Sequence, residues 1–276
     1  MKGVFITGTD TGVGKTIVSA VIIRALIRKG IKVGAMKPLE TGCKKAEGTV
    51  PDLRTEQGGV PLYRAGVESE LSPWGSTLIP ADGMFLREMA EMDDPIDLVT
   101  PVRFEQPLAP MVAADIEKKV VDLDAVRGAY KALSGKYDFM VVEGVGCLLV
   151  PIMRSPSPAT RHPSPFFVAD LIKDLNLPVI IVACLKLGTI NHTLLTVNQA
   201  LREGLNVSGV IISQSALSDN TISAKTNPDA MRELCSVPIL GTVPYLNIVN
   251  RENIEIIAAD VGRWLLSERP FSDGIG

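Results

Sequence analysis

A glycine-rich turn near the start of this 276-residue chain constrains its fold more than any other segment. The apolar run Val4–Ile6 leads into Gly8-Thr9-Asp10-Thr11-Gly12-Val13-Gly14-Lys15-Thr16. When a strand ends in such a turn and continues as a helix, backbone N–H groups face an anion at the positive end of the helix dipole. The segment therefore predicts a strand, an anion-binding turn and a helix in direct succession.

A nucleotide phosphate is the anion that suits the residues of this turn best. Glycine permits a positive φ and a close approach of the backbone, Lys15 can reach the β- and γ-phosphates, and the Thr16 hydroxyl can bind Mg²⁺. The spacing departs from the usual P-loop, because five residues instead of four separate Gly8 from Gly14. An ordinary strand-to-helix turn that happens to end in Lys-Thr is the alternative interpretation. The residues predicted to bind the nucleotide here are Gly12, Val13, Gly14, Lys15, Thr16 and Ile17.

The composition is typical of one cytoplasmic α/β domain. With 46% hydrophobic residues, the chain can bury one large core, and we predict a single domain over residues 1–276. A net charge of -3 gives no electrostatic reason to expect nucleic acid or an anionic membrane as a partner. The first residues lead into the strand that the turn requires, and no apolar stretch approaches the ~18 residues of a membrane span. The four cysteines form no CxxC pair, so we expect reduced thiols and no structural zinc.

Short apolar runs alternate with helical patterns along the chain, as in a parallel sheet covered on both faces. We expect strands at Val4–Thr7, Ile31–Met36, Phe139–Glu143, Val179–Cys184, Val210–Ser213 and Ile239–Val243. We expect helices at Lys15–Lys29, Gly83–Met92, Asp124–Leu133, Phe166–Leu175, His192–Glu203 and Asn253–Leu266. The pattern predicts a doubly wound α/β fold with a mainly parallel sheet, whose strand ends meet at one ligand-binding edge.

Two stretches interrupt this pattern and are predicted to be loop insertions. Residues 43–81 are polar and rich in turn residues, and residues 153–165 carry four prolines. Long connections of this kind in a compact domain are functional lids or disordered insertions. The proline-rich stretch could instead be a ligand for the aromatic groove of a partner.

Candidate catalytic side chains follow two of the predicted strands. Lys37 ends the second strand, where its charge could stabilise a γ-phosphoryl group in transfer. Glu143 ends a buried strand and could reach a magnesium ion, and the glycines of Gly144-Val145-Gly146 let the backbone pass close to phosphate. The alternatives are a solvated lysine at position 37 and a glutamate that only caps the next element. Asp82 precedes a predicted helix and could be only its N-cap, a choice that spacing alone does not decide.

The segment Lys186-Leu187-Gly188-Thr189-Ile190-Asn191 follows the strand Val179–Cys184 and precedes His192. His192 stands at a predicted helix start, where capping or packing is the simpler role. Asn191 is the better candidate for binding a ligand.

Four motifs of this chain resemble those of the dethiobiotin synthetase family, and the resemblance covers nearly the whole length. They are Thr7–Thr16, with the same lengthened P-loop, Lys37-Pro38 through Thr41-Gly42, Val142–Gly146, and Lys186–His192. The third is shared with the wider group of P-loop synthetases, whereas Lys37-Pro38 and the last motif are specific to dethiobiotin formation. The resemblance also implies a P-loop NTPase type of fold.

The resemblance implies an ATP- and Mg²⁺-dependent ring closure in biotin biosynthesis. In that reaction 7,8-diaminononanoate and CO₂ give a carbamate, ATP phosphorylates it, and the second amine closes the ring to give dethiobiotin, ADP and phosphate. Lys15 and Lys37 would be catalytic, and Thr16, Asp82 and Glu143 would hold the metal. Gly144, Val145 and Gly146 would lie along the nucleotide.

The resemblance also assigns residues to the substrate and to the base. Thr11, Lys37 and Thr41 would contact the diamine, and Gly188, Thr189, Ile190 and Asn191 would reach its carboxylate end across a homodimer interface. Pro244, Tyr245 and Leu246 resemble a segment whose backbone reads adenine. Ser213 and Gln214 stand where the family usually has Asn-Asp, which leaves the preference for a base open. Cys147 replaces a glycine that commonly follows the glutamate loop.

Three other functions share parts of this pattern. A nucleotide-switch ATPase of the partitioning or division type has the same fold, but it carries a lysine early in the P-loop, where this chain has Thr9 and Asp10. A cobyrinate-type amide synthetase needs a second, glutamine-hydrolysing domain. A nucleotide-sensing regulatory domain would not need Lys15, Thr16, Lys37 and Glu143 together.

Overall fold

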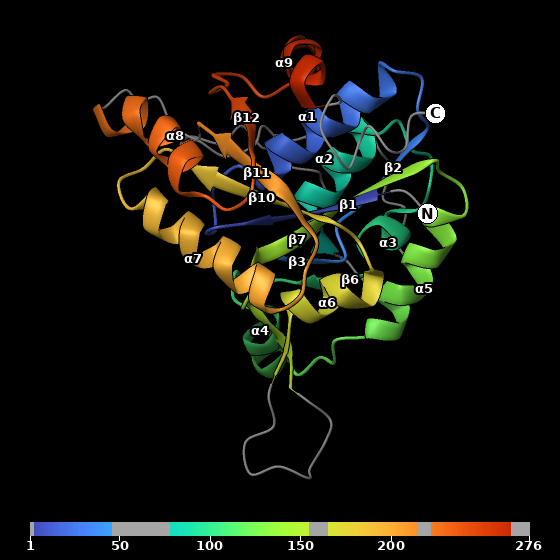
Figure 1. The fold of residues 1–276 in the computed structure, drawn as a ribbon. Coiled ribbons are helices and arrows are strands. Elements are labelled where there is room, and N and C mark those ends of the chain that lie inside the picture. Colours follow the sequence, from blue (N-terminus) through green and yellow to red (C-terminus); the bar gives the residue numbers. More distant parts are fainter. Residues whose placement is uncertain (1–2, 46–77, 155–164, 215–221, 266–276) are drawn as a thin grey trace.

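A parallel sheet of six strands forms the centre of the protein, as Figure 1 shows for this computed structural model, which describes residues 3–45, 78–154, 165–214 and 222–265. Every neighbouring pair of its strands is parallel. In spatial order the strands are β12 (Ile239–Val243), β11 (Val207–Ser213), β10 (Val179–Cys184), β1 (Gly3–Gly8), β7 (Phe139–Cys147) and β2 (Val33–Met36). The predicted doubly wound α/β fold is confirmed.

Helices cover both faces of this sheet (Figure 1). One face carries α1 (Lys15–Ile27), α2 (Ala81–Met89) and α9 (Arg251–Leu265), and the other carries α5 (Leu123–Ser134), α6 (Val168–Leu175) and α7 (Thr189–Arg202). The described residues also form α3 (Ile96–Val99), α4 (Pro110–Glu117) and α8 (Ile222–Leu234). None of the described helices is long and apolar enough to cross a membrane.

The apolar pattern of each helix matches its neighbours. In α6 the buried residues Val168, Leu171, Ile172 and Leu175 recur every three or four positions, which is the spacing of one helical face. Helix α1 is buried on all sides from Val18 to Leu26, because α2 and α9 pack beside it. A helix that is buried on all sides lies in the core, so α1 gives the P-loop that precedes it a defined position.

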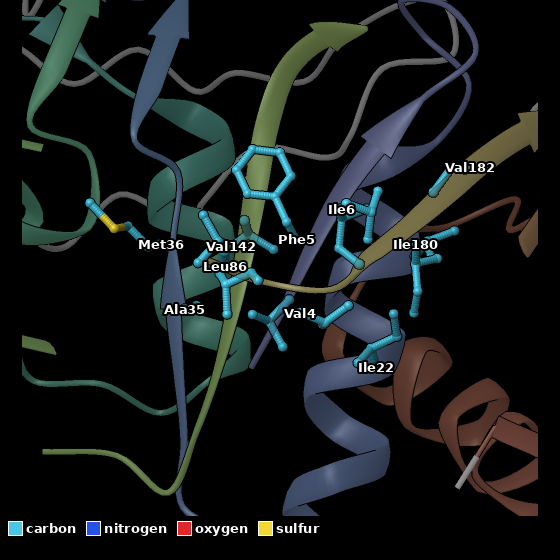
Figure 2. Packing of buried hydrophobic residues seen from close by; sticks show 14 of the residues in the cluster. Val4, Phe5, Ile6, Ile22, Ala35, Met36, Leu86, Val142, Ile180 and Val182 are labelled. Atoms are coloured by element: carbon cyan, nitrogen blue, oxygen red, sulfur yellow. The ribbon is translucent and has the colours of Figure 1, made fainter. Parts of the chain in front are cut away.

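The core lies between the sheet and its helices. Val4, Phe5 and Ile6 of β1 are fully buried, as continuous apolar strands of a doubly covered parallel sheet must be. Figure 2 shows part of this cluster, including Ile22 of α1 and Leu86 of α2. Strand β1 is therefore a rigid base for the turn that follows it.

Three short strand pairs lie outside the main sheet. Strand β3 (Leu39–Thr41) pairs in parallel with β6 (Val102–Phe104), and β4 (Lys44–Lys45) pairs antiparallel with β5 (Leu78–Ile79). Strand β8 (Pro151–Met153) pairs antiparallel with β9 (Phe166–Phe167). Strands of two or three residues are too short to show a hydrophobic period, so sequence patterns missed them.

The two predicted insertions begin and end at these antiparallel pairs. β4 and β5 join the ends of the first insertion, and β8 and β9 join those of the second. Residues 46–77 and 155–164, which make up most of the two insertions, lie outside the described residues.

Four predicted boundaries are wrong in ways that matter for the site. Helix α2 begins at Ala81, so Asp82 lies in its first turn and is not an N-cap residue. Helix α7 begins at Thr189, so Thr189, Ile190 and Asn191 belong to a helix and not to a loop. Helix α6 begins at Val168, because Phe166 and Phe167 pair with β8. Strand β7 extends past Glu143 to Cys147, because it continues to pair with β1 after a shift of register.

Candidate active site

The neighbouring strands β1, β7 and β2 bring three separate motifs to one edge of the sheet (Figure 1). The P-loop follows β1, Glu143 lies in β7, and Lys37 follows β2. Because the strands are parallel, their carboxyl ends share this edge. The predicted convergence of these motifs is observed.

The P-loop has the backbone geometry that its glycines predict. Gly12 has φ 69° and Gly14 has φ 92°, a region that favours glycine, and α1 begins at Lys15 directly afterwards. The ammonium of Lys15 is buried and donates to the carbonyl oxygen of Asp10 at 3.2 Å. Burial and the nearby charge of Lys37 lower the pKa of Lys15 from its ordinary value. A phosphate group bound in the P-loop would place a negative charge beside this buried ammonium, whose hydrogen-bond partner here is a neutral carbonyl oxygen.

Lys37 is the centre of a charged cluster that it forms with Glu143 and Asp82. Its Nζ donates to Glu143 Oε1 at 2.5 Å, to Asp82 Oδ2 at 3.1 Å and to the carbonyl oxygen of Gly144 at 3.4 Å. Burial opposes the charged form, but the carboxylates of Glu143 and Asp82 outweigh it and raise the pKa of Lys37. The lysine therefore stays positively charged near neutral pH and does not act as a general acid. The alternative of a solvated lysine at this position is wrong, since the side chain is buried.

The two carboxylates of this cluster, Asp82 and Glu143, have different surroundings. Burial opposes ionisation of Asp82, but Lys37, Thr16 and Lys15 outweigh burial and lower its pKa. Glu143 is fully buried, and its Oε1 accepts from Thr16 Oγ1 at 3.0 Å. Its second oxygen, Oε2, has no hydrogen-bond partner among the described residues. A buried oxygen without a partner is costly unless a ligand completes its environment.

Thr16, Asp82 and Glu143 fit a magnesium ion in chemistry and in arrangement. One hydroxyl and two carboxylates are the hard oxygen ligands that Mg²⁺ prefers, and phosphate oxygens commonly complete such a site. Thr16 Oγ1 donates to Glu143 Oε1, and the Lys37 ammonium donates to both Glu143 and Asp82, which places the three side chains together. The unpartnered Oε2 of Glu143 is the observation that supports this fit.

Sequence reasoning missed Glu40 as a member of this site. Its carboxylate is buried and accepts from the backbone N–H groups of Asp82 at 3.0 Å and Gly83 at 2.9 Å. Burial and the charge of Asp82 raise the pKa of Glu40 to about 7, although Lys37 and the two N–H groups oppose this. An acidic residue three positions after Lys37 was the only signal in the sequence.

The ends of β11 and β12 form the second part of the predicted nucleotide site. The Gln214 N–H donates to the Val243 carbonyl oxygen at 2.9 Å, so Gln214 and Pro244 follow paired strands. Ser213 is buried against the P-loop, where a Cβ on Gly14 would lie 2.4 Å from its Oγ. The Ser213 hydroxyl thus faces the P-loop backbone, while Gln214, Tyr245 and Leu246 are half-buried and Pro244 is exposed. Base contacts at these positions stay predictions.

The predicted substrate residues divide into two groups. Thr11 lies exposed in the P-loop and Thr41 lies half-buried at the end of β3, on the segments that carry Lys15 and Lys37. Gly188, with φ 92°, caps α7, and Thr189 is buried while Asn191 is exposed. No hydrogen bond or ion pair joins Gly188–Asn191 to Lys37 or Asp82 within the described chain. The first group lies on the chain segments that carry Lys15 and Lys37, and the second has no polar contact with Lys37 or Asp82 among the described residues.

The segment after Glu143 lies along the P-loop. Gly144 is buried, Val145 and Gly146 are half-buried, and Gly146 has φ 62°. Cys147 is opposite Gly8 in the sheet. Burial raises the pKa of Cys147 although Lys15 is close by, so its thiol stays protonated near neutral pH.

Comparison with known proteins agrees with this geometry. A family model described as an AAA domain matches residues 2–253. The ATP-dependent dethiobiotin synthetase BioD of Thermodesulfovibrio yellowstonii is 45% identical over 252 residues, which cover 91% of this chain and 92% of that protein. Proteins of the same name from Bacillus subtilis and Methanocaldococcus jannaschii are 34% and 33% identical, and they cover 92% of this chain and 92% and 96% of their own lengths. With this similarity over nearly its full length and the charged cluster in place, the chain belongs to the ATP-dependent dethiobiotin synthetase family.

Proposed function

We propose that this protein is an ATP-dependent cyclo-ligase that converts 7,8-diaminononanoate and CO₂ to dethiobiotin, with release of ADP and phosphate. The observation that carries the proposal is the cluster in which the Lys37 ammonium lies 2.5 Å from Glu143 and 3.1 Å from Asp82, at the sheet edge where the P-loop follows β1. A cluster of this kind suits the transfer of a phosphoryl group to an anionic acceptor, because such a reaction depends on positioning and on charge neutralisation.

The side chains have separable tasks in this reaction. The backbone of Gly12–Gly14 and the ammonium of Lys15 bind the phosphates of ATP, and the buried ammonium of Lys37 lies where the carbamate oxygen and the transferred phosphoryl group would carry negative charge. Thr16, Asp82 and Glu143 hold Mg²⁺, which supplies charge neutralisation of the phosphate oxygens when it is bound. Because both amines belong to one molecule, ring closure is intramolecular, and the chain has only to hold the diamine in place.

The direct test measures phosphate and dethiobiotin together. The purified protein is incubated with MgATP, bicarbonate and the diamine, and each component is omitted in turn. We expect phosphate release to require all of them and to match dethiobiotin, detected by mass spectrometry, in equal amounts. Phosphate release at the same rate with and without the diamine would contradict the synthetase activity and would support a nucleotide switch. Parallel runs with GTP and CTP test whether Gln214 permits other bases.

We infer in addition that the active form is a homodimer in the cytoplasm. The resemblance to the dethiobiotin synthetase family supports the dimer. Lys37→Gln and Asn191→Ala variants are each expected to be nearly inactive. Random exchange of the two should restore about a quarter of the wild-type rate, because about half of the dimers then contain one intact site. Mixing that restores no activity would contradict a site shared between protomers.

A further inference from the structure

Glu40 makes the same kind of contact with two successive residues of α2. Its Oε1 accepts from the Asp82 N–H at 3.0 Å and its Oε2 accepts from the Gly83 N–H at 2.9 Å. The side chain is 5% exposed, so water does not compete for these bonds. Both oxygens of one buried carboxylate are thus used on the backbone of the helix start.

Helix α2 has no cap of its own that could replace this contact. Its N-cap residue is Pro80, which makes no side-chain hydrogen bond to the first turn. The first N–H groups of a helix have no partners within the helix and carry its positive dipole, so a carboxylate is a favourable acceptor. Glu40 supplies that acceptor from β3, which is 42 residues away in sequence from Asp82.

Gly83 allows the first turn of α2 to pack closely against Thr100. A Cβ at position 83 would lie 1.9 Å from Thr100 Oγ1 and 3.5 Å from Glu40 Oε2. A larger residue would therefore clash with Thr100 and displace the first turn of α2, whereas its contact with Glu40 would be an ordinary one. The start of α2 thus packs against Thr100 and is hydrogen-bonded to Glu40.

Asp82 is consequently held twice by one short segment of chain. Lys37 binds its carboxylate at 3.1 Å, and Glu40 binds its backbone N–H at 3.0 Å. The side chain and the main chain of Asp82 are thus both bound by residues 37–40.

We propose that Glu40 is a positioning residue for the metal site, which fixes the Asp82 carboxylate by binding the backbone at the start of α2. The proposal rests on the proposed function, in which Asp82 is a ligand of Mg²⁺. Residues that orient metal ligands commonly change metal affinity by about 10- to 100-fold when they are replaced.

The test measures binding of Mn²⁺ by electron paramagnetic resonance, with a non-hydrolysable ATP analogue present. Glu40→Gln keeps the size of the side chain but puts an N–H donor opposite one of the two N–H groups. We expect it to weaken Mn²⁺ binding by about tenfold. Gly83→Ala displaces the same helix start without changing a charge, and we expect a similar loss. Asp82→Asn should weaken Mn²⁺ binding at least as much.

The control is a second carboxylate that caps a helix away from the site. Asp122 Oδ1 accepts from the Ala125 N–H at 2.8 Å at the start of α5. Asp122→Ala should lower the unfolding temperature but leave Mn²⁺ affinity unchanged. If Glu40→Gln also lowers only the unfolding temperature, Glu40 has a structural role alone and the proposal is wrong.

The outcome also separates this proposal from the proposed function. Mn²⁺ binding is measured without the diamine. If phosphate release by the wild type is the same with and without the diamine, the proposed function is contradicted, but the effect of Glu40 on Mn²⁺ binding can still be measured. If Asp82→Asn leaves Mn²⁺ affinity unchanged, Asp82 is not a ligand and the positioning role is overturned with it.

Discussion

The ammonium of Lys37 lies 2.5 Å from the buried Oε1 of Glu143, although the two residues are 106 positions apart in sequence. Their strands, β2 and β7, are neighbours in the sheet, which brings the two side chains together. Removing both charges from water costs energy that the attraction between them does not reliably return. A buried pair of this kind is therefore better explained by chemistry than by stability.

Replacement of Lys37 should separate turnover from nucleotide binding. In Lys37→Gln we expect phosphate release in the presence of the diamine to fall at least tenfold, or ~1.4 kcal/mol of transition-state stabilisation. The affinity for ATP should change little, because the P-loop and Lys15 remain. Steady-state kinetics and calorimetric titration of ATP measure the two effects. Lys45→Gln is the control, since Lys45 is exposed and pairs with Glu105 at 2.8 Å. Unchanged turnover in Lys37→Gln would make the lysine a bystander.

Loss of the Glu143 charge should raise the magnesium requirement. The Oε2 of Glu143 is buried without a partner in the described chain, and Glu143→Gln removes the charge that a cation would meet there. We expect the Mg²⁺ concentration that gives half-maximal rate to rise about tenfold, and a chelator should stop phosphate release by the wild type. Glu117→Gln is a matched control, because Glu117 is a mostly buried carboxylate that accepts from the Gln106 N–H at 2.9 Å. Equal Mg²⁺ curves for Glu143→Gln and the wild type would contradict this role.

Two glycines of the P-loop should differ in their sensitivity to alanine. Both have a positive φ, which costs alanine about 1–2 kcal/mol. A Cβ at Gly14 would also lie 2.4 Å from Ser213 Oγ, whereas a Cβ at Gly12 would have no neighbour within 4 Å. Urea unfolding without nucleotide should therefore show that Gly14→Ala loses about 1–3 kcal/mol more than Gly12→Ala. Adding Ser213→Ala to Gly14→Ala should recover part of the difference, and equal losses at the two glycines would contradict the Ser213 contact.

The Asp94 carboxylate should make the free energy of unfolding depend on pH in the acid range. Burial opposes its ionisation, but hydrogen bonds from Lys136 at 2.6 Å and from the Tyr137 hydroxyl outweigh burial and lower the pKa of Asp94 below its ordinary value of 3.8. A lowered folded-state pKa stabilises the protein above the unfolded pKa, and this contribution disappears as the pH falls through the folded pKa. Asp94→Asn should therefore cost about 2 kcal/mol at about pH 7, and less as the pH falls below about 4.

Urea unfolding of the wild type and Asp94→Asn across this pH range measures the effect. Asp124→Asn is the control, because the Asp124 side chain is 93% exposed beside Arg127 and should change stability little at any pH. A cost for Asp94→Asn that stays constant with pH would show that Asp94 acts through packing and not through its charge.

The P-loop and the strands of the main sheet could be predicted because their signals are local. The turn Gly8–Thr16 carries all of its requirements within consecutive residues, and strands buried on both faces are continuous apolar runs, as Val179–Cys184 is in the structure. Helix starts were less predictable. Helix α2 begins two residues before its predicted start, because its first N–H groups donate to Glu40, which lies in strand β3.

The sequence by itself determined the nucleotide-binding turn, the parallel sheet and the ligand-binding edge, because these depend on short-range pattern and on the handedness of strand connections. The tertiary structure alone decided that Lys37 faces Glu143, that Glu40 holds the start of α2, and that Ser213 lies against Gly14. Each of these contacts joins residues that are distant along the chain. Their geometry follows from strand order and from burial. Because burial removes water, polar groups have to form hydrogen bonds within the protein.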